Sequence, residues 1–146
     1  MLAIGSDHGG FALKQELLDY LKEQGIPVHD YGCYDTASVD YPDIAKTVCE
    51  AVLDGRCERG ILVCGTGLGM SIAANKVRGI RAAQVCDAFS ARMAREHNNA
   101  QIITLGGRVV GPELAKTVVS AYLQAEFAGG RHELRLQKIA NIEEQR

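Results

Sequence analysis

Short apolar runs alternate with longer amphipathic stretches along the whole chain, and no other feature constrains the fold as strongly. The short runs are rich in β-branched residues and predict strands at 2–5, 28–31, 61–64, 80–85 and 102–105. The longer stretches have helical spacing and predict helices at 11–24, 42–53, 68–76, 88–96 and 112–127. Five strand–helix repeats of this kind predict an α/β fold. We expect a doubly wound, five-stranded parallel sheet in a three-layer α/β/α sandwich.

Composition narrows the function classes. The chain has 146 residues, so residues 1–146 are expected to form a single domain. Its net charge is -2, so it lacks the basic excess of a nucleic-acid-binding protein. No apolar run approaches the ~20 residues that span a bilayer, so no membrane partner is expected. No secretion signal follows Met1, and the five cysteines include no CxxC pair. These features favour a cytoplasmic protein with reduced thiols and no metal site.

The order of the strands locates a candidate binding crevice. Doubly wound sheets bind ligands beyond the carboxyl ends of their strands, at the point where the strand order reverses. With the expected order 2-1-3-4-5, this point lies between the first and third strands. The first strand is followed by SDHGG at 6–10, and the third by CGTGLGMS at 64–71. We expect these two loops to face each other.

Gly65, Gly67 and Gly69 form the most informative of these loops. Glycines between a strand and a helix let successive N–H groups turn toward an anion at the helix N-terminus. Met70 breaks the dinucleotide pattern G-x-G-x-x-G, and the GK[ST] of a P-loop is missing, so a nucleotide is disfavoured. The alternative is that these glycines only allow close packing between helix and strand.

Cys64 precedes the glycine loop and is a candidate base or nucleophile. The helix dipole and nearby N–H donors are expected to lower the pKa of its thiol. The alternative is a buried cysteine that acts as a small apolar side chain, as expected for Cys49 and Cys86. A cysteine phosphatase would have an arginine where this chain has Met70, so we favour a base over a phosphoryl-transfer nucleophile.

Histidines, amides and arginines complete the candidate site. His8 and His97 suit proton transfer near neutral pH, and the amide of Asn98 suits sugar hydroxyls. The guanidiniums of Arg131 and Arg135 lie one helical turn apart, which suits a phosphate dianion. His132 lies between them, and Arg108 follows the fifth strand.

Separation between the strands makes these groups hard to combine within one chain. In the order 2-1-3-4-5 the fifth strand lies about 10 Å from the third, because neighbouring strands are about 4.8 Å apart. Arg108 would then not reach Cys64. A two-fold homodimer with the site at its interface removes this difficulty, so we expect a homodimer, with the helix at about 132–144 packed on the partner.

The motifs together resemble one family. SDHGG, DYPD at 40–43, ILVCGTGLGMSIAANK at 61–76, REHNNA at 95–100, GGRVVG at 106–111 and GGRH at 129–132 resemble the ribose-5-phosphate isomerase B family, over nearly the whole chain. The resemblance implies a Rossmann-like sandwich, an aldose–ketose isomerase of the pentose phosphate pathway, no metal or cofactor, and a homodimer or tetramer with shared sites. Retention of the HN pair and the GGRH arginine favours ribose 5-phosphate over galactose 6-phosphate.

The same resemblance implies a role for each candidate residue. Cys64 would move the proton between C1 and C2 of the sugar, and His97 would open the furanose ring. The enediolate would be stabilised by Thr66 and by the backbone of Gly65, Gly67, Leu68 and Gly69. Sugar contacts would come from Asp7, His8 and Asn98. Phosphate contacts would come from Arg108, Arg131, His132 and Arg135, with His8 as a further candidate.

Two other functions stay open at this point. One is an isomerase of a six-carbon sugar phosphate such as allose 6-phosphate. The other is a sugar-phosphate-binding module without catalytic activity, since a fold alone does not determine function. The coincidence of Cys64, Thr66 and His97 favours the enzyme, because a module that only binds has no need for all three.

Overall fold

The computed structural model describes residues Met1 to Arg146 and contains five strands and six helices. The strands are β1 (Leu2–Ser6), β2 (Val28–Asp30), β3 (Arg59–Cys64), β4 (Ala82–Gln84) and β5 (Ile102–Gly106). The helices are α1 (Phe11–Glu23), α2 (Tyr41–Leu53), α3 (Leu68–Asn75), α4 (Ala88–Glu96), α5 (Pro112–Gln124) and α6 (Arg131–Glu144). Each predicted element is present, with bounds that differ by up to three residues. None of the helices combines the length and the apolar character that a bilayer crossing requires.

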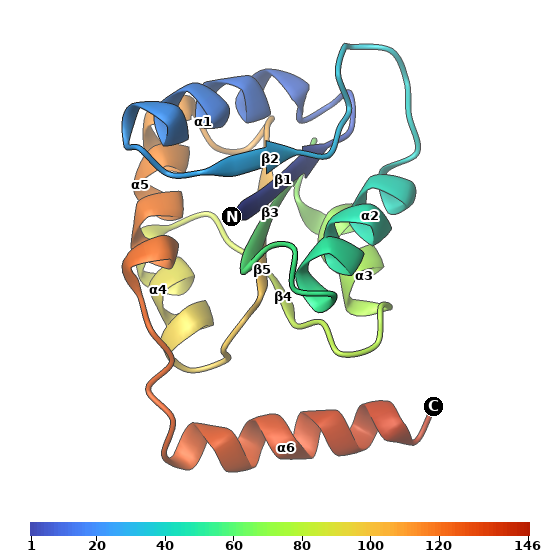
Figure 1. Cartoon of the computed structure of the whole chain (residues 1–146), viewed down its shortest axis with the longest axis vertical. Coiled ribbons are helices and arrows are strands. Elements are labelled where there is room, and N and C mark those ends of the chain that lie inside the picture. The colour runs from blue at the N-terminus through green and yellow to red at the C-terminus, as the bar shows by residue number, and fades with distance from the viewer.

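The strands form one parallel sheet covered by helices on both faces, which confirms the predicted fold class. Side chains of β3 alternate between the two faces, as the period of a strand requires. Ile61 and Val63 pack in a cluster with α1, α4 and α5, whereas Leu62 and Cys64 pack with α2 and α3. Figure 1 shows these two helical layers on opposite sides of the sheet.

The order of the strands differs from the expected 2-1-3-4-5. The sheet has the order β2-β1-β3-β5-β4, so β5 pairs directly with β3 and β4 forms the edge. The physical reason is burial. All five residues of β5 are buried, which requires a neighbour on each side, whereas the three residues of β4 are half-buried and include Gln84.

A buried ion pair fixes the chain beside the end of β1. Lys14 of α1 is fully buried, and its Nζ donates to both carboxylate oxygens of Asp30 at 2.7 and 2.9 Å. The same ammonium also donates to the Cys33 carbonyl. The Cys33 N–H in turn donates to the Ser6 carbonyl at 2.6 Å. These contacts hold the segment that follows β2 against Ser6, the last residue of β1. Asp7 is the next residue along the chain.

Helix α6 belongs to neither helical layer (Figure 1) and contains no buried residue. It contacts the rest of the chain near the turn before β4. The Gly79 N–H donates to a Glu143 carboxylate oxygen at 3.1 Å, and Arg78 pairs with Glu144 at 3.0 Å. A groove of about 240 Å³ separates Ile139 from the β4 edge. The packing of α6 on a partner chain stays a prediction. The exposure of α6 along its whole length supports it.

Candidate active site

The loop between β3 and α3 holds Cys64 under a backbone donor. The Gly67 N–H donates to Cys64 Sγ at 3.1 Å, and the residue Cys64 is 5% exposed. Gly67 has a φ of +82°, and a Cβ at this position would lie 2.9 Å from the carbonyl carbon of Leu105. Only glycine fits both constraints. The loop therefore places a hydrogen-bond donor on the sulfur, which favours negative charge there.

Two hydroxyl groups hold the backbone of this loop. Thr66 Oγ1 accepts a hydrogen bond from the Leu68 N–H at 3.2 Å, and the Thr66 side chain is exposed. Thr104 of β5 is fully buried, and its Oγ1 donates to the Gly67 carbonyl at 2.7 Å. Thr104 was not predicted from the sequence as a residue of the site. The feature that could have indicated it is that it is the one polar side chain in an otherwise apolar strand.

The loop after β1 faces the glycine loop, as predicted. A Cβ at Gly9 would lie 3.2 Å from the Gly65 nitrogen, so the two backbones are in close contact. Asp7 is buried, and its Oδ1 accepts from the Gly10 N–H at 3.1 Å. His8 is exposed, and its Nδ1 accepts from the Val39 N–H at 3.3 Å.

Arg108 lies beside Cys64 in its own chain, which corrects the expectation from the sequence. Its N–H donates to the Gly65 carbonyl at 2.9 Å, and the preceding Gly107 N–H donates to the Cys64 carbonyl at 2.8 Å. A Cβ at Gly65 would lie 3.2 Å from Arg108 Nη1. The expectation was wrong because β5 neighbours β3, so the loop after β5 meets the glycine loop directly.

A second cluster combines the remaining candidates. The rings of His97 and His132 are stacked, with centroids 4.2 Å apart and planes inclined by 14°. Arg131 and Arg135 are close enough for their charges to act on His132. Partial desolvation and then the charges of His97, Arg131 and Arg135 lower the pKa of His132. Asn98 follows His97 and is exposed. The cluster is cationic and open to solvent.

These two clusters lie at opposite ends of the strands. We call the side formed by the carboxyl ends of the strands the carboxyl edge, and the side formed by their amino ends the amino edge. Cys64 pairs with Gly106 at the carboxyl ends of β3 and β5, whereas Gly60 pairs with Ile102 at their amino ends. At about 3.3 Å per residue, the four residue steps from Gly60 to Cys64 separate these edges by about 13 Å. His97 follows the last residue of α4, and α4 returns from the carboxyl edge to the amino edge. Cys64 and His97 of one chain therefore cannot act on the same sugar.

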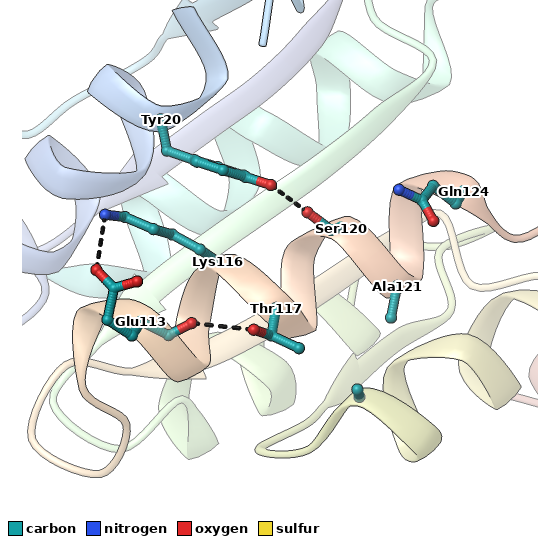
Figure 2. A pocket seen from close by; sticks show the side chains of 8 residues that line it. Tyr20, Glu113, Lys116, Thr117, Ser120, Ala121 and Gln124 are labelled. Carbon is teal, nitrogen blue, oxygen red and sulfur yellow. Dashed lines mark hydrogen bonds and ion pairs between the residues drawn. The ribbon is translucent and has the colours of Figure 1, made fainter. Parts of the chain in front are cut away.

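One groove of the single chain lies outside both clusters. This groove of about 470 Å³ is lined mainly by α5, with Tyr20 of α1 and Ala88 of α4. Figure 2 shows Tyr20 and the α5 side chains of its lining from close by. Tyr20 hydrogen-bonds Ser120, and Lys116 pairs with Glu113, so these four side chains already have partners. None of the candidate residues lines it.

Comparison with known proteins identifies the family. A family model described as Ribose/Galactose Isomerase matches residues 2–139. The chain belongs to this family. D-erythrulose-4-phosphate isomerase of Pectobacterium atrosepticum is 51% identical, over 99% of this chain and 95% of that protein. Ribose-5-phosphate isomerase B of Escherichia coli is 47% identical, over 99% and 97%.

Solved structures agree with this assignment. The structure of Clostridium thermocellum ribose-5-phosphate isomerase B has a TM-score of 0.97 and 56% identity, and the match covers 99% of this chain and 97% of that one. A Thermotoga maritima ribose 5-phosphate isomerase has a TM-score of 0.94 and 53% identity, over 96% and 97%. These relatives make this chain a sugar-phosphate isomerase of the ribose/galactose isomerase family.

The stacked histidines of this family member generate a testable prediction. Since positive charge on His97 lowers the pKa of His132, replacing His97 with asparagine should raise the His132 pKa toward its ordinary value. In the unmodified protein the His132 pKa should lie below the ordinary histidine value. NMR titration of the imidazole signals measures both values. A His132 pKa that stays the same or falls in His97→Asn would contradict the coupling.

Proposed function

We propose that this chain interconverts D-ribose 5-phosphate and D-ribulose 5-phosphate through a cis-enediolate, with the Cys64 thiolate as the base. The observation that carries the proposal is the hydrogen bond from the Gly67 N–H to Cys64 Sγ at the start of α3. It marks the sulfur as a place where negative charge is stabilised. The named relatives supply the reaction class.

The chemistry requires a base and a set of fixed donors. Cys64 removes the proton from C2 of the open-chain aldose, and the electrons move onto O1. The O2 hydroxyl proton passes to O1, and Cys64 returns its proton to C1, which gives the ketose. A hydrogen on carbon beside a carbonyl is weakly acidic, so donors must stabilise the developing oxyanion, each by roughly 3 kcal/mol. Thr66 and the N–H groups of Gly65 and Gly69 are the donors we assign to this role, since the Gly67 and Leu68 N–H groups already donate to Cys64 and Thr66.

A homodimer with shared sites follows from the separation of the two clusters. We assign Cys64, Asp7, His8 and Arg108 to one chain, and the histidine–arginine cluster to its partner. Exposed apolar side chains support such an interface. Leu68 and Ile72, one turn apart on α3 beside the glycine loop, are 55% and 64% exposed. Leu134, Ile139 and Ile142 are exposed along α6.

The partner's cluster is suited to phosphate and to ring opening. Arg131 and Arg135 lie one turn apart at the start of α6, where two guanidiniums can bind one phosphate in a forked geometry. His132 lies between them. His97 is placed by this arrangement to exchange a proton with the ring oxygen of the furanose, and Asn98 to contact a hydroxyl. The reaction then needs neither a metal nor a cofactor.

One relative favours a second candidate function. The Pectobacterium atrosepticum protein, at 51% identity, is named D-erythrulose-4-phosphate isomerase, so a four-carbon sugar phosphate is an alternative substrate. Allose 6-phosphate is the six-carbon alternative, and binding without turnover is a third. The four-carbon substrate differs from ribose 5-phosphate in a way that allows the ring-opening step to be tested. Its O4 carries the phosphate, so it cannot close a furanose ring, and no ring has to be opened.

Substitution of the base tests the mechanism first. Cys64→Ala should lower kcat by at least about 10³-fold, because no other group is placed to take the C2 proton. Binding of ribose 5-phosphate, measured by calorimetry, should change little. Cys49→Ala is the matched control, since Cys49 is also a free, buried cysteine but has no role in the proposed mechanism. Substantial turnover by Cys64→Ala, with folding intact, would contradict the assignment.

Substrate choice is tested by initial rates on ribose 5-phosphate, erythrulose 4-phosphate and allose 6-phosphate, with and without a chelator. We expect the highest kcat/KM for ribose 5-phosphate and no effect of the chelator.

His97→Ala should lower kcat on ribose 5-phosphate by about 10²-fold, the size of an acid–base contribution. It should affect erythrulose 4-phosphate far less, because that sugar has no ring. Equal losses on both sugars would refute the ring-opening role.

Hybrid dimers test the sharing of sites. Cys64→Ala and Arg131→Ala chains are each expected to be nearly inactive. After mixing and exchange, half the dimers are hybrids, and each hybrid has one site with both halves intact. Activity should therefore recover to about a quarter of the unmodified level. If the mixture is no more active than its components although hybrids have formed, shared sites are excluded.

A further inference from the structure

Arg81 is a half-buried arginine at the amino end of β4 that the proposed mechanism does not use. Its guanidinium donates from Nε to the Asn98 carbonyl at 2.9 Å and from Nη2 to the Asn99 carbonyl at 3.0 Å. Two neighbouring carbonyls are thus held by one planar group. These are the carbonyls that directly follow His97.

The segment that Arg81 holds is the irregular end of α4. Carbonyls at the end of a helix lack intrahelical partners and carry partial negative charge, so a cation there is favourable. Asn99 has a φ of +44°, in the left-handed region that few residues other than glycine adopt. Its N–H donates to the Arg95 carbonyl at 3.1 Å. The turn that carries His97 and Asn98 is therefore a specific conformation with a specific external partner.

Arg81 is itself rigidly held. Its N–H donates to Gln101 Oε1 at 2.8 Å, and its carbonyl accepts from the Gln101 N–H at 3.1 Å. Burial lowers the pKa of its guanidinium, and the Glu143 carboxylate of α6 opposes that shift. An arginine fixed at its backbone and bonded at two nitrogens transmits its position to the turn that it binds.

We propose that Arg81 is a positioning residue that sets the His97–Asn98 turn for the active site of the partner chain. The inference deepens the proposed function and rests on it, because it takes His97 and Asn98 to act on the sugar held at the partner's Cys64. Arg81 does not touch that sugar. Its effect passes through the two carbonyls that it binds.

The test compares three full-length variants. Arg81→Met keeps the apolar stem and removes both donors, whereas Arg81→Lys keeps the charge but lacks the fork that bridges two carbonyls. Arg78→Met is the matched control, since Arg78 lies three residues away, is exposed and bonds only Glu144. Thermal unfolding and sedimentation first establish that each variant is folded and associates as the unmodified protein does. If Arg81→Met fails to fold, Arg81→Lys carries the test.

A direct readout follows the position of His97 and does not depend on the substrate. In Arg81→Met, NMR signals of the His97 and His132 imidazoles should shift, because the turn that keeps the two rings stacked is released. Arg81→Lys should show a smaller shift, and Arg78→Met none. Unchanged signals in Arg81→Met would overturn the proposal, whichever sugar phosphate the enzyme uses.

A second readout assigns Arg81 to one half of the shared site. On ribose 5-phosphate, kcat should fall about 10-fold in Arg81→Met, with KM changed less, because the phosphate-binding arginines remain. Mixing with Cys64→Ala chains should restore activity in hybrids, whereas mixing with His97→Ala chains should not. The proposal would be overturned if His97→Ala chains restored activity in the mixture and Cys64→Ala chains did not. It would also be overturned if the kcat of Arg81→Met equalled that of Arg78→Met. Failure of Cys64→Ala and His97→Ala chains to complement each other would instead refute the shared site, and the imidazole signals would still decide the role of Arg81.

Discussion

In a parallel sheet, each helix that follows a strand returns the chain to the opposite edge, and this constraint determines where the candidate site residues of this protein lie. Cys64 ends β3 at the carboxyl edge, and His97 follows α4 at the amino edge. About 13 Å of strand lies between these edges. No side-chain rotation closes such a gap. The constraint divides the candidate residues into two halves, and the homodimer that we propose joins them.

Each half is built on backbone rather than on side chains alone. At the carboxyl edge, Gly67 adopts a positive φ against Leu105 and directs its N–H at Cys64, while Thr104 binds its carbonyl. At the amino edge, Arg81 binds the carbonyls after His97. A catalytic group must be held to within a fraction of an ångström, and peptide groups fixed at both ends provide that precision.

Much of this arrangement could be predicted from the sequence, because it depends on local patterns. Alternating apolar runs predicted the strands and helices, and glycine spacing predicted the loop beside Cys64. The order of β4 and β5 was predicted wrongly, since strand order depends on relative burial: all of β5 is buried, whereas β4 is half-buried. Arg108 was misplaced for the same reason. Thr104 and Arg81 were missed because a single buried polar contact leaves no repeated pattern in a sequence.

A crystal structure of the protein with ribulose 5-phosphate bound would show directly whether two chains share one site. We expect C1 and C2 of the sugar to lie against Cys64 Sγ of one chain, with the phosphate on Arg131 and Arg135 of the partner. A sugar phosphate bound entirely by residues of one chain, or with its first two carbons away from Cys64, would contradict this expectation.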